Sequence, residues 1–158
     1  MTAKKTDRAR SGRGMTKADY EALGSFRYAL RRFLRFTEDG AAEVGLKPQQ
    51  HQAMLVIMGM PGREEATVGE IAERLQIEHH SAVGLVQRLE AGGYVRRRRD
   101  AEDRRQVVVS LTAKGLAVLE RLSLSNLSEL GRIGNDLLDA INGVVARKET
   151  TSGPTRGK

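Results

Sequence analysis

The sequence contains no cysteine and no tryptophan among its 158 residues, and it has only three prolines. The missing cysteine excludes disulfide bonds, thiolate zinc sites and thiol-based redox sensing. No apolar run approaches the ~20 residues that a membrane-spanning helix requires, and the basic start of the chain lacks the apolar stretch of a signal peptide. A chain of this length suits one compact domain, so we expect a single cytoplasmic domain without membrane contact.

Positive charge is abundant but unevenly distributed. The net charge is +7, of which residues 1–18 contribute +5 and residues 147–158 contribute +3, so the remainder sums to −1. Overall charge therefore does not establish a nucleic-acid partner, and local clustering has to do so. Both ends are rich in Gly, Ser, Thr, Lys and Arg, a composition that buries too little apolar surface to become ordered. We expect disordered tails at 1–18 and 147–158 around a domain at 19–146.

The middle of the chain has mostly helical periodicity. Apolar residues recur at three- and four-residue spacing over about 19–45 and 113–146, which predicts long helices at both ends of the domain. Pro48 suits the first turn of a further helix. Thr67 and Glu70 have the spacing of a capping box, which predicts a short helix that ends near Leu75. A helix with a buried stripe from Ala82 to Leu89 follows after a brief turn.

The helical periodicity of apolar residues changes after Gly92-Gly93, a pair suited to ending a helix. Residues 94–97 and 107–111 are short β-prone runs around a charged loop, which predicts a hairpin. Thr112 can cap the helix that follows. The predicted fold is mainly α with a small β-hairpin wing: a winged helix-turn-helix at about 47–112, flanked by the two long helices.

A cluster of arginines surrounds the predicted hairpin. Seven arginines occur within eighteen residues, and four of them, Arg96 to Arg99, are consecutive. The planar guanidinium binds phosphate through two hydrogen bonds and fits a narrow minor groove. The alternative is a solvated hairpin whose arginines pair with Asp100, Glu102 and Asp103. We favour DNA binding, because four consecutive arginines exceed what solubility requires.

Short motifs from about Leu46 to Leu119 resemble the signature of the MarR family of winged helix-turn-helix transcriptional regulators. They are Leu75-Gln76-Ile77, Ser81-Ala82-Val83, Arg88-Leu89-Glu90, Gly93-Tyr94-Val95-Arg96-Arg97, Asp100-Ala101-Glu102-Asp103-Arg104-Arg105 and Leu111-Thr112-Ala113-Lys114-Gly115. The resemblance implies that Asp103 holds Arg105, which enters the minor groove. It also implies a homodimeric repressor that releases DNA when a small anionic or aromatic compound binds. Two positions depart from the pattern: Gln76 stands where such turns often have glycine, and Lys47 where threonine often precedes the second helix.

The buried stripe of the predicted recognition helix defines its exposed face by subtraction. The candidate DNA-binding residues on this helix are His79, His80, Ser81, Val83, Gly84, Gln87 and Arg88. Those in the wing are Arg97, Arg98, Arg99, Asp103, Arg104 and Arg105. Gln87 can pair with an adenine edge. For Arg88, a structural ion pair or stacking contact is as good an explanation as a phosphate contact.

The remaining candidates concern other ligands. The histidines do not predict a metal site, because adjacent histidines on a helix point in different directions and no further ligands accompany them. No cofactor is predicted. An effector pocket of the family type would involve Arg27, Arg31, Phe33, His51 and Met54, although these residues suit an ordinary interface and core equally well.

Two rival functions remain open. A winged helix can serve protein contacts or DNA architecture without a specific operator. An enzyme is disfavoured, because the chain has no Ser-His-Asp set, phosphate loop or ligand-competent carboxylate cluster. We also expect a homodimer, because one small lobe cannot cover all the apolar residues of the C-terminal helix. The residues expected to pack against a second chain are Leu119, Leu122, Leu130, Ile133, Leu137 and Ile141.

Overall fold

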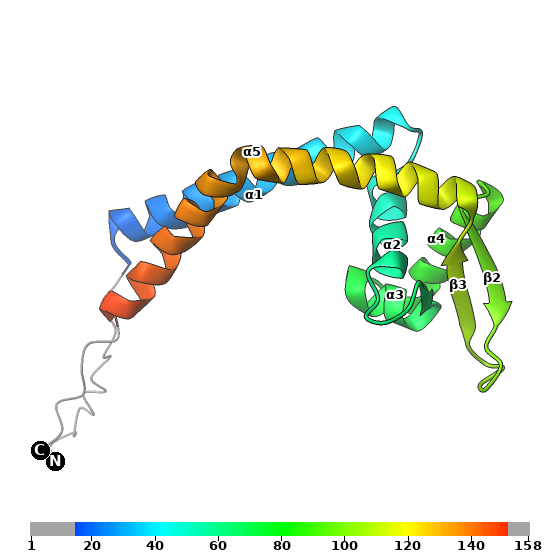
Figure 1. Ribbon diagram of the computed structural model, residues 1–158. Coiled ribbons are helices and arrows are strands. Elements are labelled where there is room, and N and C mark those ends of the chain that lie inside the picture. Colours follow the sequence, from blue (N-terminus) through cyan, green and yellow to red (C-terminus); the bar gives the residue numbers. More distant parts are fainter. Residues whose placement is uncertain (1–14, 152–158) are drawn as a thin grey trace, which may run out of the picture. The chain divides into compact units, whose positions relative to one another are not determined.

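The structure is a computed structural model that describes residues 15–151 (Figure 1). Its elements are α1 (Lys17–Glu43), α2 (Pro48–Met58), β1 (Glu65–Thr67), α3 (Val68–Leu75), α4 (His79–Ala91), β2 (Val95–Arg99), β3 (Val107–Leu111) and α5 (Ala113–Thr151). The chain forms two compact units. Residues 32–132 make up one, and the first part of α1 with the last part of α5 makes up the other.

The mainly helical fold with a small wing is confirmed, but the sheet has one strand more than the predicted hairpin. Its order is β1-β3-β2, and both neighbouring pairs are antiparallel. In the hairpin, Val95 pairs with Leu111 and Arg99 with Val107. The added strand β1 is three residues long and places Ala66 opposite Val109. So short a run carries no alternation that distinguishes a strand from a loop.

The core of the larger unit lies among α2, α3, α4 and the sheet. Each of these elements contributes fully buried apolar side chains, among them Met54, Ile57, Ile71, Leu85 and Val109. The predicted stripe of α4 is also buried, from Ala82 to Leu89. Its opposite face therefore remains available to solvent.

Local sequence signals set the helix ends that position α4. The Thr67 hydroxyl accepts the Glu70 N–H at 3.2 Å, and the Glu70 carboxylate accepts the Thr67 N–H at 2.8 Å, which confirms the capping box of α3. Thr112 caps α5 by accepting the Gly115 N–H at 3.0 Å. At α2, Lys47 offers no side-chain cap, and the Gln50 amide oxygen accepts the Lys47 N–H at 2.8 Å.

Gln76 adopts the left-handed conformation that its place in the turn requires, with φ 54° and ψ 45°. The N–H of Gln76 donates to the Glu73 carbonyl, and the N–H of Ile77 donates to the Ala72 carbonyl. This pair of bonds is a Schellman ending, which usually has glycine at the left-handed position. The Gln76 side chain adds a bond of its own, because Nε2 donates to the Glu73 carbonyl at 2.7 Å. Gln76 thus adopts a backbone angle that is uncommon for residues other than glycine.

The C-terminal segment is one continuous helix, α5. It extends to Thr151, past the expected end at residue 146, because residues 147–149 have high helix propensity. Likewise α1 begins at Lys17, inside the expected tail. The remainder of the two predicted tails, residues 1–14 and 152–158, lies outside the described residues.

The expectation that a second chain must cover the apolar residues of α5 is wrong for three of them. Leu119, Leu122 and Ile133 are buried within the single chain. Leu119 and Leu122 belong to the same buried cluster as the end of α1, so the lobe covers more of α5 than its periodicity indicates. Other large apolar side chains of the long helices remain exposed: Leu23, Leu30, Leu124, Leu127, Leu138, Ile141 and Val145. Within residues 15–151, no helix has the length and apolar character needed to cross a membrane.

Candidate nucleic-acid interface

The exposed face of α4 carries the polar side chains predicted for it. His79, His80, Ser81, Gln87 and Arg88 are exposed, whereas Val83 and Gly84 are partly covered. A Cβ at Gly84 would lie 3.4 Å from the Arg88 guanidinium, so the glycine leaves room for Arg88 to lie along the helix. No described residue pairs with the Arg88 side chain in an ion pair.

The wing loop between β2 and β3 is built around two aspartates. The Asp100 carboxylate accepts the N–H groups of Glu102 at 2.7 Å and Asp103 at 3.0 Å, and these backbone hydrogen bonds hold the pKa of Asp100 below its ordinary value. The Asp100 N–H donates to the Gln106 carbonyl at 3.0 Å, which closes the loop. The charged loop between β2 and β3 is thus an ordered turn.

Asp103 contacts Arg105 through both backbone and side chain. Its Oδ1 accepts the Arg105 N–H and Nε–H, each at 3.1 Å, and its Oδ2 accepts Nη2 at 3.3 Å. The Arg105 side chain is nevertheless 92% exposed. The hydrogen bonds from Arg105 lower the pKa of Asp103, so the carboxylate is ionised at neutral pH. The geometry agrees with the role that the resemblance implies, an arginine oriented by an aspartate.

Two of the consecutive arginines are engaged by carboxylates of neighbouring elements. Arg97 donates its Nε to Glu90 of α4 at 2.6 Å, and this bond lowers the pKa of Glu90. Arg98 reaches Glu65 of β1, with Nη2 at 2.8 and 2.9 Å from the two carboxylate oxygens. These pairs join the wing to α4 and to the added strand β1. Sequence reasoning missed both acidic partners, because no local spacing signals a contact between side chains of different elements.

The remaining wing arginines differ in their engagement. Arg99 donates Nη1 to the carbonyl of Arg104 at 2.8 Å, and this hydrogen bond stabilises the wing loop. Arg96 and Arg104 are exposed, and their guanidinium groups form no ion pair with another described residue. Arg88, Arg96, Arg104 and the exposed Arg105 are therefore the cations of this surface best placed to meet a phosphate.

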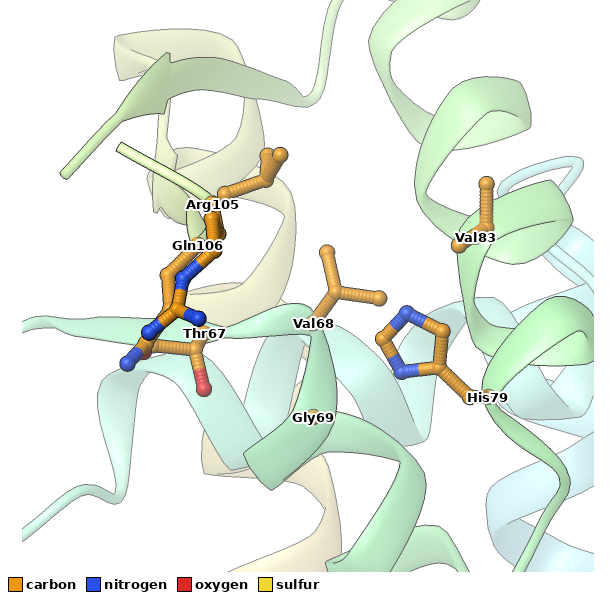
Figure 2. Close-up of a pocket in the computed structure, with 8 residues that line it drawn as sticks. Thr67, Val68, Gly69, His79, Val83, Arg105 and Gln106 are labelled. Carbon is orange, nitrogen blue, oxygen red and sulfur yellow. The ribbon is translucent and has the colours of Figure 1, made fainter. Parts of the chain in front are cut away.

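A cleft of about 220 Å³ lies between the loop end of the wing and the start of α4. Figure 2 shows His79 and Val83 on one side, Arg105 and Gln106 on the other, and Val68 with Gly69 between them. Thr67 and Val107 complete its lining. The predicted set contained His79, Val83 and Arg105 but not Gln106, which the tertiary structure brings to them.

A second, larger cleft of about 590 Å³ lies among the C-terminal half of α1, α2 and α5. Its lining residues are Phe33, Leu34, Thr37, His51, Gln52, Leu55, Ser123, Asn126, Leu127 and Leu130. Of the predicted effector residues, Phe33 and His51 line this cleft. Met54 is fully buried, and Arg27 and Arg31 belong to the other compact unit of the chain.

His51 is the unusual residue of the second cleft. It is only 4% exposed, and its Nε2 has no hydrogen-bond partner among the described residues. Burial lowers its pKa, so the imidazole is neutral at neutral pH. Within residues 15–151, no three His, Asp or Glu side chains gather in a way that would hold a metal ion.

Comparison with known proteins agrees with this geometry. Residues 44–106 match the model of the MarR family. Over 61 residues, the chain is 44% identical to the HTH-type transcriptional regulator TtmR of Methylorubrum extorquens, a match that covers 39% of this chain and 31% of TtmR. The curated relatives are matched over only 31 to 51% of their own lengths.

Solved structures extend the likeness to nearly the whole chain. AbsC, a MarR family transcriptional regulator from Streptomyces coelicolor, superposes with a TM-score of 0.69 and 18% identity over 90% of this chain and 99% of AbsC. Overoxidised AbfR bound to DNA superposes with a TM-score of 0.55 and 21% identity over 81% of this chain and 92% of AbfR. At these identities the superpositions establish the fold. The family model matches the part of the chain that holds α2, the helix-turn-helix, β2 and the wing loop.

Proposed function

We propose that this protein is a sequence-specific regulator of transcription that binds double-stranded DNA as a homodimer and represses until a small molecule releases it. The observation that supports this best is the placement of Arg105. Asp103 orients the exposed guanidinium through its backbone and side chain, beside an α4 face that carries polar groups. A helix that reads the major groove and a cation that enters the adjacent minor groove are the two contacts that a winged helix offers DNA.

The contacts divide by kind in this proposal. The N-terminal part of α4, with His80 and Ser81, approaches the major groove, and Gln87 reads a base edge through its amide. Arg88, Arg96 and Arg104 neutralise phosphates, because they are exposed and free of ion pairs within the described chain. Arg97 and Arg98 hold the wing in position through Glu90 and Glu65. The solved complex of AbfR with DNA supports this arrangement, since AbfR shares the fold.

The dimer is supported by the apolar side chains that the single chain leaves exposed. Leu138, Ile141 and Val145 on α5 and Leu23 and Leu30 on α1 are exposed in one chain, and soluble monomers rarely leave so many large apolar side chains on two helices. A two-fold dimer would present two α4 helices to successive major grooves about 34 Å apart, on a pseudo-palindromic operator. Sedimentation at micromolar concentration should give twice the chain mass, and a helical monomer would contradict the proposal.

The operator is tested with DNA that flanks the protein's own gene. Nuclease protection should map a pseudo-palindromic site, and titration should show much tighter binding to it than to a random duplex. Equal affinity for both duplexes would favour the rival function, a winged helix used for protein contacts or DNA architecture.

The effector site we propose is the cleft that contains Phe33 and His51. Most of the surface that lines it is apolar, and Nε2 of the neutral His51 imidazole has no hydrogen-bond partner among the described residues. An aromatic molecule with one uncharged hydrogen-bonding group suits this cleft better than an anion, because no lysine or arginine is among its lining residues.

A panel of phenols and aromatic acids tests the effector proposal. A binding phenol should raise the melting temperature of the wild-type protein and release DNA, and it should do neither for His51→Leu. The exposed-residue variant His80→Leu serves as the control for the thermal shift. Absence of any shift across the panel would contradict this part of the proposal and leave the DNA-binding part standing.

A further inference from the structure

The cleft in Figure 2 joins two elements that DNA would contact in different grooves. His79 belongs to the first turn of α4, whereas Arg105 and Gln106 belong to the end of the wing loop. Val68 lies between them, and Val83 of α4 and Val107 of β3 add apolar side chains to the lining. Its polar groups therefore stand on two facing walls of a hollow of about 220 Å³.

The charges around the cleft suit an anion. No aspartate or glutamate is among its lining residues. Arg105 donates Nε and Nη2 to Asp103, which leaves Nη1 for a second acceptor. On the facing wall, neither imidazole nitrogen of His79 is engaged by another described residue. The Asp103 contact thus orients Arg105 without saturating it.

The path of a DNA strand identifies the anion. The major and minor grooves of a duplex are separated by one sugar-phosphate strand at each edge. If α4 occupies the major groove and Arg105 enters the adjacent minor groove, the strand between these grooves must cross between α4 and the wing. The cleft lies at this crossing.

From this arrangement, which rests on the proposed function, we propose that the cleft seats one backbone phosphate of the bound DNA. His79 donates to it from the α4 wall, and Arg105 Nη1 donates to it from the wing wall. Gln106 lines the wing wall but already donates Nε2 to Asp103 at 3.3 Å, so its part is to keep Asp103 and Arg105 in place. Each half-site of the operator would contain one such phosphate.

The adjacent histidines His79 and His80 have different roles in this proposal, although the sequence alone does not distinguish them. Consecutive helix residues point about 100° apart, so His79 lines the cleft while His80 does not. His79 then positions the protein on the backbone and carries no base preference, because phosphate contacts hold register without reading sequence. His80 remains a residue of the major-groove face and is the matched control.

The test combines two variants with two kinds of DNA. His79→Ala should weaken binding to the protected operator and to an unrelated duplex of equal length by the same factor, roughly five-fold per half-site. His79→Gln retains a donor and should bind within about two-fold of wild type. Circular dichroism confirms that both variants fold. A His79→Ala loss confined to the operator would overturn the proposal, because a base contact would then explain it.

Neutral phosphate analogues locate the contact. Methylphosphonates placed one at a time along the operator should show one position per half-site, between the major-groove and minor-groove contacts, where wild-type affinity falls. That penalty should nearly vanish in His79→Ala and persist in His80→Ala. An unchanged penalty in His79→Ala overturns the phosphate seat even if operator preference is intact. If the wild-type protein binds the operator and the unrelated duplex with equal affinity, and the methylphosphonate penalty still vanishes in His79→Ala, the idea of a specific operator is overturned. The phosphate seat is then supported.

Discussion

The buried imidazole of His51 leads to a prediction about stability. The side chain is 4% exposed, and Nε2 finds no partner among the described residues. A buried polar group without a hydrogen bond costs about 1–3 kcal/mol, whereas an apolar side chain of similar size in the same place carries no such cost. We therefore expect His51→Leu to raise the free energy of unfolding by about 1–2 kcal/mol at neutral pH.

The pH dependence of folding stability provides a second, independent test of this prediction. Burial lowers the folded-state pKa of His51 below 6.5, so the unfolded chain takes up this proton at a higher pH than the folded chain does. Stability therefore falls as pH decreases below about 6.5, until the folded-state pKa is reached. His51→Leu lacks this loss, and its advantage over wild type should grow on acidification. The other histidines are present in both proteins, so their contributions cancel when the two free energies of unfolding are subtracted.

Urea denaturation of both proteins, from about pH 7.5 to about pH 5.5, measures these effects. Protomer concentration must be equal throughout, because association contributes to the stability of a dimer. His80→Leu, at an exposed position of α4, is the control and should gain nothing. A destabilised His51→Leu, or an advantage that stays constant with pH, would show that Nε2 has a partner in solution and refute the reasoning.

Further predictions follow from single contacts. Asp103→Ala should weaken DNA binding roughly three- to ten-fold although it removes a negative charge, because Arg105 then loses its orientation; tighter binding at several salt concentrations would reduce the wing to a charged patch. Gln87→Ala should relax specificity at one position of each half-site by roughly 1–3 kcal/mol with little change in salt dependence, as titration of single-base operator variants would show. Gly115→Ala should destabilise the fold by about 3 kcal/mol or more in thermal unfolding, because the new Cβ would clash with the Tyr94 carbonyl oxygen. Gly131→Ala, in the open part of the same helix, should instead stabilise the fold by up to about 1 kcal/mol. Gln76→Gly should stabilise by about 1 kcal/mol by relieving the left-handed backbone, and Gln76→Ala should not.

Local sequence signals determined the order of the elements and most of their ends. The Thr67–Glu70 box, the glycine pair after α4 and the Thr112 cap act within a few residues, so their spacing alone predicts the bonds that the structure contains. The buried stripe of α4 follows from helical periodicity in the same way. The Asp103–Arg105 contact, by contrast, was implied by the resemblance to the MarR family, and the structure contains it.

Contacts between distant segments were decided only by the tertiary structure. Strand β1 exists because β3 offers it a free edge, and Glu65 then meets Arg98 across 33 positions of sequence. Arg97 and Arg98 looked equivalent to their neighbours in the sequence, yet carboxylates on other elements engage both. Phe33 and His51 share one cleft, and Gln106 faces His79 across another. Periodicity specifies which face of an element is buried, but the partner of that face depends on how the chain folds back on itself.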